Sequence, residues 1–267
     1  MSHHTIRRGV LLCLLLFAAG CGGGTRDVSP ANVANPDRFL YDRGQAALKE
    51  RKWVDAREYF RQVVDNYPGS PLRPDAKLAI GDTYLGEKSS ESLVLADSEY
   101  REFLTFYPTN PRADYAQFKL AMSYFEQMRA PDRDQTATKD ALQEFQVFFT
   151  RHPQSPLVPE ARQKWREARD RLSDASFEVA KLYYRMRVDA GSASRLQEIL
   201  KEDPEYTRRD GVYFYLAELY LRADNKGQVK PENKAQAVPY LKRLVTEFSA
   251  SEYLEEARKR LQELNVQ

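Results

Sequence analysis

The sequence predicts an all-α solenoid of about five helical hairpins, with a long connecting helix after the third hairpin and a C-terminal capping helix. A small residue, two large apolar residues and usually a proline recur at one spacing in five places. A second pattern precedes each copy, and one long segment from about Val158 contains no glycine. The five copies of the first pattern are Ala56/Phe60/Val63/Pro68, Ala96/Tyr100/Phe103/Pro108, Ala141/Phe145/Phe148/Pro153, Ser192/Leu196/Ile199/Pro204 and Ala237/Leu241/Leu244/Ser249.

Composition agrees with a globular chain. The 267 residues are 42% hydrophobic and 30% charged, which supports a hydrophobic core and includes no long membrane-spanning run. The formal charge of +2 comes from Arg7 and Arg8, in a segment that we expect to be removed. The mature chain would then carry 41 − 2 = 39 basic residues against 39 acidic ones. This balance argues against a general phosphate-binding surface, so nucleic acid is not an expected partner.

The N-terminal residues have the features of a secretory signal peptide. Arg7 and Arg8 precede an apolar run, Val10 to Ala19, that is too short to span a membrane and ends in small residues. We expect residues 1–20 to be cleaved. The next residue is Cys21, and the string Phe17-Ala18-Ala19-Gly20-Cys21 resembles the lipobox of bacterial lipoproteins, although Ala18 stands where Leu is common.

This resemblance implies a diacylglyceryl group on the Cys21 sulfur and an acyl group on its freed amine, with no other cofactor. The alternative is an ordinary secretory segment with an incidental cysteine. Lipidation gives Cys21 a use, because it is the only thiol left in the mature chain and has no disulfide partner. Gly22, and not Asp, follows it; by resemblance to enterobacterial sorting this favours the outer membrane, on its periplasmic face. Residues 21–36 are expected to form a flexible tether.

The second pattern predicts the first helix of each hairpin. Residues spaced three and four apart share one helical face, and a small residue in the middle lets the partner helix approach closely. The proline of the first pattern then ends the second helix. The five copies of the second pattern are Tyr41/Gly44/Ala47, Leu78/Gly81/Tyr84, Phe118/Ala121/Tyr124, Phe177/Ala180/Tyr183 and Phe214/Ala217/Tyr220. The residues expected to pack the repeats are Gly44, Ala56, Phe60, Pro68, Gly81, Ala96, Tyr100, Pro108, Ala121, Ala141, Phe145, Pro153, Ala180, Pro204, Ala217 and Ala237.

These positions resemble the tetratricopeptide repeat, and the first unit fits it best. The two small residues of a unit lie 12 residues apart in units one and four, 15 in unit two and 20 in units three and five. The added residues include turn formers such as Ala130-Pro131-Asp132 and Asp224-Asn225-Lys226-Gly227, so we expect longer loops between the paired helices. The fifth unit ends at Ser249 without a proline.

The glycine-free segment predicts one helix from about Val158 to Arg187, roughly 45 Å long at about 1.5 Å per residue. Its apolar stripe runs through Ala161, Trp165, Ala168 and Leu172 into the fourth unit. This helix would separate repeats one to three, residues 37–156, from a C-terminal part, residues 157–267. Tyr253, Ala257, Leu261 and Leu264 predict a final amphipathic helix that caps the last repeat.

Taken together, the lipobox, the irregular repeats and the long helix resemble the BamD-type lipoproteins of the outer-membrane β-barrel assembly machine. Four strings support the resemblance over about residues 36 to 220: Tyr67-Pro68-Gly69-Ser70, Asp132-Arg133-Asp134-Gln135, His152-Pro153-Gln154-Ser155, and Glu178-Val179-Ala180 followed by Tyr183-Tyr184. The resemblance implies a periplasmic scaffold whose C-terminal half contacts the polypeptide-transport-associated domains of the barrel insertase. Its N-terminal half would receive the C-terminal β-signal of unfolded outer-membrane proteins, and other assembly lipoproteins would be further partners.

Matching the first unit to the concave surface of tetratricopeptide arrays selects five candidate peptide-binding residues, Arg38, Tyr41, Gln45, Leu48 and Lys49. Aromatic, aliphatic and cationic groups together suit an extended peptide with an apolar terminus and a carboxylate. Asp132, Arg133 and Asp134 are a second candidate site, because repeat packing does not require them. They are either a partner contact or a loop held by local ion pairs.

Catalysis is not expected. His3 and His4 leave with the signal peptide, and His152 lies just before a helix-ending proline. One histidine and one lipidated cysteine cannot form a His/Cys metal site or a catalytic pair, and Gly22-Gly23-Gly24 lacks the Lys-Ser/Thr of a phosphate loop. The alternatives to barrel assembly are a pilotin-like or cell-division-associated lipoprotein, and an adaptor for cell-wall synthesis.

Overall fold

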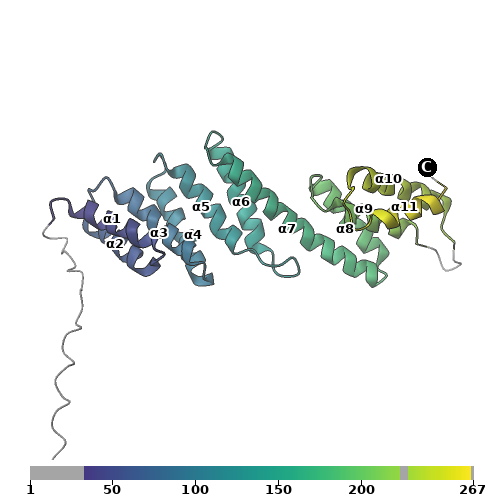
Figure 1. Cartoon of the computed structure of the whole chain (residues 1–267), viewed down its shortest axis with the longest axis horizontal. Coiled ribbons are helices and arrows are strands. Elements are labelled where there is room, and N and C mark those ends of the chain that lie inside the picture. The colour runs from purple at the N-terminus through teal and green to yellow at the C-terminus, as the bar shows by residue number, and fades with distance from the viewer. Residues whose placement is uncertain (1–32, 223–227, 266–267) are drawn as a thin grey trace, which may run out of the picture.

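The computed structural model describes residues 33–222 and 228–265, and within these ranges every regular element is an α-helix. Figure 1 shows the helices side by side along one elongated body. They form five antiparallel hairpins, α1–α2 to α9–α10, followed by α11. The helices are α1 (Pro36–Lys49), α2 (Trp53–Asn66), α3 (Arg73–Glu87), α4 (Ser90–Phe106), α5 (Ala113–Glu126), α6 (Thr136–Arg151), α7 (Val158–Arg185), α8 (Asp189–Glu202), α9 (Arg209–Tyr220), α10 (Pro231–Glu247) and α11 (Leu254–Glu263). The predicted all-α solenoid is confirmed.

Close approach of the paired helices depends on the small residues. Ala56 and Phe60 of α2 are fully buried, and a Cβ added to Gly44 of α1 would lie 2.6 Å from the Phe60 ring. In the second hairpin a Cβ on Gly81 would lie 2.7 Å from Tyr100. An aromatic ring of the second helix therefore lies directly on the backbone of the first, which only glycine permits at this distance.

The four prolines expected to pack the repeats do not do so, and this expectation was wrong. Pro68, Pro108, Pro153 and Pro204 are all exposed. Each lies two residues beyond the end of its helix, after a residue that has left α geometry, such as Tyr67 with φ −127° and ψ 63°. Phe248 adopts nearly the same angles before Ser249, so the fifth hairpin ends its second helix without a proline. The other twelve repeat-packing positions are buried.

A serine after the turn closes three of the five hairpins. The hydroxyl groups of Ser70, Ser155 and Ser251 each donate a hydrogen bond to an aspartate at the start of the same hairpin's first helix, at 2.6 Å. The acceptors are Asp37, Asp114 and Asp210. The same serine oxygens accept a backbone N–H two residues later, so one side chain fixes both the turn and the hairpin.

Successive hairpins join at a constant spacing with one exception. The small residue of a second helix precedes that of the next first helix by 25 residues at three junctions, from Ala56, Ala96 and Ser192. At these junctions a side chain of the second helix donates to a tyrosine 23 residues later. The pairs are Arg61–Tyr84 at 2.6 Å, Arg101–Tyr124 at 3.0 Å and Gln197–Tyr220 at 3.1 Å.

The exception is α7, where 39 residues separate Ala141 from Ala180. The N-terminal part of α7 packs Ala161 and Trp165 against the third hairpin, and its C-terminal part supplies Phe177 and Ala180 to the fourth. The predicted long helix is confirmed at 28 residues and ends at Arg185 because Arg187 has a left-handed φ of 61°. Repeats three and four are thus joined through one shared helix.

Loop lengths depart from the expectation in one hairpin. The third hairpin has the expected long connection, residues 127–135, but in the second hairpin only Lys88 and Ser89 separate α3 from α4. Its extra residues lengthen the helices, so the predicted longer loop was wrong there. The string from Asp224 to Gly227 lies outside the described residues. The body also begins one residue earlier than expected, with Pro36 as the first residue of α1.

The C-terminal cap covers the fifth hairpin. Ala257 of α11 is buried, and the Tyr253 ring stacks on Phe214 of α9 with a centroid distance of 4.7 Å. Across the described residues, no helix combines the length and apolar character needed to cross a bilayer.

Candidate protein-binding surfaces

The first helices of hairpins one to three present a shared surface, here called the N-terminal inner surface. It comprises Tyr41 and Gln45 of α1, Asp82 of α3, and Arg112, Tyr115 and Lys119 at the start of α5. Burial raises the pKa of the half-buried Tyr41, and the charges of Asp75, Arg112 and Asp82 also act on it. Side chains from three hairpins therefore lie within electrostatic reach of one another.

Asp82 is at the centre of this surface. Its Oδ1 accepts hydrogen bonds from the hydroxyls of Tyr100 at 2.7 Å and Tyr115 at 2.9 Å. Burial raises the pKa of Asp82, while the two tyrosines, Lys119 and Arg112 act in the opposite direction. The carboxylate thus fixes the position of the Tyr115 ring rather than facing solvent as a free charge.

Two cations lie over the face of Tyr115. The Arg112 guanidinium is 4.7 Å and the Lys119 ammonium 5.3 Å from the ring centroid, and Arg112 also pairs with Asp75 at 3.1 Å. Lys119 has no carboxylate partner among the described residues. An aromatic face beside a cation is a suitable site for an apolar side chain next to a carboxylate.

The five residues predicted from the first unit divide into three groups. Tyr41 and Gln45 are half-buried and belong to the N-terminal inner surface, with the Tyr41 ring 5.6 Å from that of Phe60. Leu48 packs against the apolar core, whereas Arg38 is exposed and pairs with Asp42 at 3.2 Å. Lys49 is exposed at the end of α1, away from the others along the helix.

The sequence prediction missed Asp82, Arg112, Tyr115 and Lys119. A register comparison contained part of the signal, because Asp82 follows Gly81 as Gln45 follows Gly44, and Tyr115 precedes Ala121 as Arg38 precedes Gly44. Residues of the concave face were predicted for the first unit alone. Arg112 lies in the turn before α5, where helical periodicity does not apply.

The string Asp132-Arg133-Asp134-Gln135 forms an exposed loop between α5 and α6. Gln135 donates to the carbonyl oxygens of Ala130 and Arg133, and Asp134 accepts from the backbone and hydroxyl of Thr136, which lowers its pKa. Asp132 and Arg133 pair only loosely, at 3.7 Å. Asp134 and Gln135 therefore build the loop, and Asp132 and Arg133 display their charges from it.

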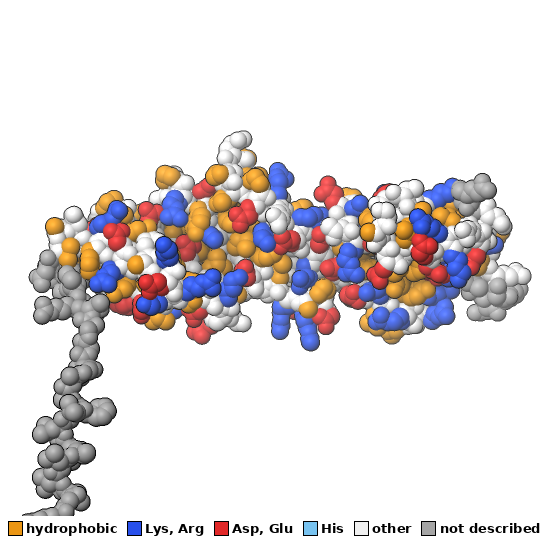
Figure 2. All heavy atoms as spheres, viewed as in Figure 1, with side chains coloured by type: hydrophobic (Ala, Val, Ile, Leu, Met, Phe, Trp, Pro, Cys, Tyr) orange, Lys and Arg blue, Asp and Glu red, His pale blue; other side chains and the backbone are white. Residues whose placement is uncertain are grey.

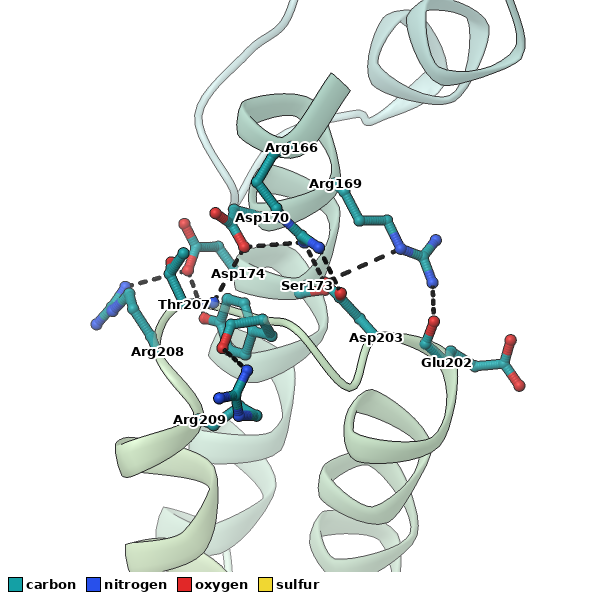
Figure 3. A network of polar contacts seen from close by, with 11 residues as sticks. Arg166, Arg169, Asp170, Ser173, Asp174, Glu202, Asp203, Thr207, Arg208 and Arg209 are labelled. Atoms are coloured by element: carbon teal, nitrogen blue, oxygen red, sulfur yellow. Dashed lines mark hydrogen bonds and ion pairs between the residues drawn. The ribbon is translucent and has the colours of Figure 1, made fainter. Parts of the chain in front are cut away.

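A charged network holds the turn between α8 and α9 on the middle of α7 (Figure 3). Asp203, in the turn after α8, is 4% exposed and receives two hydrogen bonds from Arg166, at 2.8 and 2.5 Å, and one from Ser173 at 2.6 Å. Burial raises the pKa of Asp203, but the hydrogen bonds from Arg166 and Ser173 outweigh it and lower the pKa overall. Asp174 adds bonds from Tyr206 and Arg208 of the same turn.

The C-terminal half contains an open groove of about 400 Å³ between the end of α7, the end of α9 and α11. Arg222 stacks on Tyr184 at 4.1 Å and pairs with Asp189, while Arg260 pairs with Glu218 at 2.8 Å. Leu221 and Leu264 supply the apolar part of its lining. This combination suits a protein partner with mixed polar and apolar side chains.

His152 lies at the turn after α6, packs on Phe148 with a ring distance of 5.9 Å, and has its pKa lowered by burial. In residues 33–222 and 228–265, no three His, Cys, Asp or Glu side chains come together as a metal site. Cys21 lies outside the described residues, so its lipidation stays a prediction.

Known proteins similar to this chain agree with one another. Residues 33–234 match the model of the YfiO family, described as an outer membrane lipoprotein. The chain is 28% identical over 219 residues to a protein of Caulobacter vibrioides, covering 80% of this chain and 70% of the relative. It is 26% identical over 227 residues to a Haemophilus influenzae protein, covering 80% and 83%, and 25% identical over 249 residues to one of Xylella fastidiosa, covering 87% and 83%. All three relatives are named outer membrane protein assembly factor BamD.

Proposed function

Because the chain belongs to the YfiO family of outer membrane lipoproteins, a family of assembly factors and not of enzymes, we propose that it is a scaffold of the β-barrel assembly machinery. In this proposal a lipid on Cys21 holds it on the periplasmic face of the outer membrane. The N-terminal half binds unfolded barrel proteins, and the C-terminal half binds the insertase. Other assembly lipoproteins are further partners.

The observation that carries substrate binding is the aromatic and cationic chemistry of the N-terminal inner surface. Tyr41 and Tyr115 offer half-buried rings, and Lys119 lies over Tyr115 without a carboxylate of its own among the described residues. A peptide that ends in an aromatic residue places its ring and its terminal carboxylate close together. Such a terminus can stack on a tyrosine and pair with Lys119 at once.

The test is a comparison of two peptides, one with a free C-terminal carboxylate after an aromatic residue and one amidated there. The carboxylate peptide should bind the mature chain about tenfold more tightly, because a charge-assisted hydrogen bond contributes about 1.5 kcal/mol or more. Lys119→Gln should remove this preference, and Tyr41→Ala should weaken both peptides. Lys201→Gln on α8 is a matched loss of charge and should change neither. Equal affinity for both peptides would refute the proposed site.

Insertase binding is assigned to the C-terminal half because its open groove lies opposite the substrate end of the body. The test is affinity purification from detergent-solubilised envelopes. Stoichiometric recovery of a large β-barrel with periplasmic transport-associated domains is expected, and Leu221→Glu should reduce it while Lys139→Glu should not. Recovery of a pilus, cell-division or cell-wall complex in its place would contradict the proposal and support the adaptor alternative.

Anchoring is tested separately. The mature protein should begin at Cys21 and carry the mass of one diacylglyceryl and one acyl group in intact mass spectrometry. Cys21→Ser should release the protein from outer-membrane fractions, because one or more acyl chains are the expected source of membrane binding. Retention of the Cys21→Ser protein in these fractions at high salt would rule out the lipid as the principal anchor.

A further inference from the structure

The elongated body has two long edges made of turns. The turns inside hairpins, residues 50–52, 88–89, 127–135 and 186–188, lie along the lower edge in Figure 1, here called the within-hairpin edge. The turns between hairpins lie along the opposite edge. Because the two helices of each hairpin are antiparallel and the hairpins stack side by side, turns of one kind line up along each edge of the body.

Cations gather along the within-hairpin edge. Lys49, Arg51, Arg129, Arg185 and Arg187 are exposed and have no carboxylate partner among the described residues. Lys88 pairs with Glu126 at 2.8 Å but keeps 59% of its side chain exposed. Some acidic groups near these turns pair with other cations, as Glu50 does with Lys52, Glu87 with Arg57 and Asp132 with Arg133. Asp55, Glu91 and Asp134 are also exposed near these turns and have no ion pair among the described residues. Figure 2 shows Lys and Arg side chains at this lower edge, with Asp and Glu side chains among them.

Three of these cations occupy backbone positions that favour glycine. Arg51, Lys88 and Arg187 have φ values of 59°, 58° and 61° in the turns of hairpins one, two and four. A residue with a Cβ in this left-handed region costs about 1 kcal/mol or more relative to glycine. The same unfavourable backbone conformation therefore occurs in three turns of the within-hairpin edge, and each time the residue has a long cationic side chain. Arg51 and Arg187 are exposed and form no ion pair among the described residues, whereas Lys88 pairs with Glu126.

Exposed apolar side chains share this edge. Seven large hydrophobic residues are exposed in the described part of the chain, and all except Phe106 lie in a turn inside a hairpin or in the half of a helix nearer to that turn. Val54 is 69% exposed at the start of α2, and Met186 is 61% exposed in the α7–α8 turn. The others are Val94 and Leu95 in α4, Leu182 at the end of α7, and Val188.

The opposite edge differs in part. Several of its cations are used within the fold: Arg73 donates to Tyr107 and a backbone oxygen, Arg112 pairs with Asp75, and Arg208 pairs with Asp174. Arg151 and Arg162 are exposed there and have no carboxylate partner among the described residues. Ser70, Ser155 and Ser251 lie at this edge and close their hairpins through hydrogen bonds from their hydroxyl groups to aspartate carboxylates. Most of the exposed apolar groups therefore lie at the within-hairpin edge, and among the described residues the cations in left-handed turns lie there alone.

From this contrast we propose that the within-hairpin edge lies on an anionic phospholipid surface. Lys and Arg attract anionic headgroups, and exposed Val, Leu and Met side chains enter the boundary between headgroups and acyl chains. A purely acidic protein partner would use the cations but not the apolar groups among them. The inference rests on the proposed outer-membrane location, which brings this edge near a bilayer.

The chain is long enough for the Cys21 anchor and this edge to meet the same bilayer. Fifteen residues separate Cys21 from Pro36, which can span up to about 50 Å when extended. The 14 residues of α1 separate its start from the within-hairpin edge by only about 21 Å. The anchor therefore permits the within-hairpin edge to lie on the membrane. The lipid on Cys21 and this edge would then fix the orientation of the body relative to the bilayer.

The test is vesicle co-flotation of the mature full-length chain with Cys21→Ser, which removes any lipid. We expect binding at low salt to vesicles of phosphatidylethanolamine with phosphatidylglycerol, little binding to phosphatidylcholine vesicles, and a strong decrease as salt rises. The triple variant Arg51→Gly, Lys88→Gly and Arg187→Gly should bind about 100-fold more weakly, at about fivefold per cation. Because glycine relieves the three left-handed positions, we expect the variant to stay folded although it loses the ion pair of Lys88 with Glu126.

The matched control removes three charges from the opposite ends of helices, through Arg151→Gln, Arg162→Gln and Lys201→Gln, and should bind as the parent does. Met186→Ser with Val188→Ser should weaken binding to anionic vesicles by about tenfold. No flotation at low salt, or equal loss in the control and the glycine variant, would overturn the inference. The assay contains neither insertase nor substrate, so its outcome is independent of the assembly role.

Discussion

The junctions among the first three hairpins and the junction at α7 join repeats in different ways. One apolar core runs from Leu40 in α1 to Leu120 in α5 and meets the core of the third hairpin at Met122 and Tyr124. The fourth hairpin has its own core, and its α8–α9 turn is held on α7 through Arg166, Asp203 and their neighbours. Hydrophobic burial thus dominates the N-terminal stack, whereas at α7 apolar contacts to the third hairpin are combined with a charged network to the α8–α9 turn.

This difference indicates which junction should depend on salt and pH. Hydrophobic packing is almost independent of salt and pH, while a charged junction depends on both. The middle of α7 is also held from the other side, because Arg171 donates to the carbonyl oxygen of Arg129 in the third hairpin's loop at 2.6 Å. Polar contacts from both neighbours therefore converge on the segment that sets the distance between the two halves.

The largest expected effect comes from breaking the apolar stack. Phe145→Ala in the third hairpin should lower the free energy of unfolding by about 3–5 kcal/mol, because a fully buried ring leaves a cavity. Chemical denaturation followed by circular dichroism measures this change. The exposed Phe106→Ala is the control and should cost well under 1 kcal/mol; a similar cost for both variants would contradict the proposed core.

The next effect concerns the charged junction. Asp203→Asn should cost about 2 kcal/mol, because the part-buried Arg166 loses one of its two carboxylate partners and keeps only Asp170. The pKa of Asp203 is lowered in the folded state, so its stabilisation is present above the ordinary value of about 3.9 and is lost as pH falls through the folded value.

Unfolding midpoints measured from pH 7 down to pH 2.5 test this dependence. The parent protein should lose stability below about pH 4 more steeply than Asp203→Asn does. Asp140→Asn, on the surface of α6, is the matched control and should keep the parent's pH profile. Parallel profiles for the parent and Asp203→Asn would show that the network does not couple to folding.

A smaller effect is expected at the tyrosine bonds between hairpins. Tyr124→Phe removes the bonds to Arg101 and Asp97 and should cost about 1 kcal/mol. Gln197→Ala should cost less, because its bond to Tyr220 is neutral and exposed. Denaturation midpoints of the two variants give the comparison, and a larger loss for Gln197→Ala would reverse the assignment of the tighter junction to the N-terminal half.

The smallest effect has the opposite sign. Arg51→Gly should stabilise the first hairpin by about 0.5–1 kcal/mol, because glycine adopts its left-handed backbone without strain. Thermal unfolding should show a slightly raised midpoint. Lys52→Gly, one residue later with a negative φ, should destabilise instead. A destabilised Arg51→Gly would mean that its side chain has a packing role in the fold.

Much of the fold was predictable from sequence because its determinants are local. Ala56, Phe60 and Val63 repeat at helical spacing, and the glycine-free run to Arg185 has no helix breaker after Pro159. The candidate site was harder, since Asp82 and Tyr115 meet across 33 residues and two helices. The prolines were predicted correctly as helix ends but wrongly as packing residues, because both roles give the same sequence pattern and only burial separates them.

The length of α7 also sets a distance between the two proposed binding regions. Relative to the other junctions it carries 14 additional residues, about four helical turns and about 21 Å. Adding or removing seven residues would move the fourth hairpin by about 10 Å with only about 20° of rotation, whereas one residue would rotate it by about 100°. Insertions in steps of seven would therefore let the spacing between two partners change while each keeps its orientation.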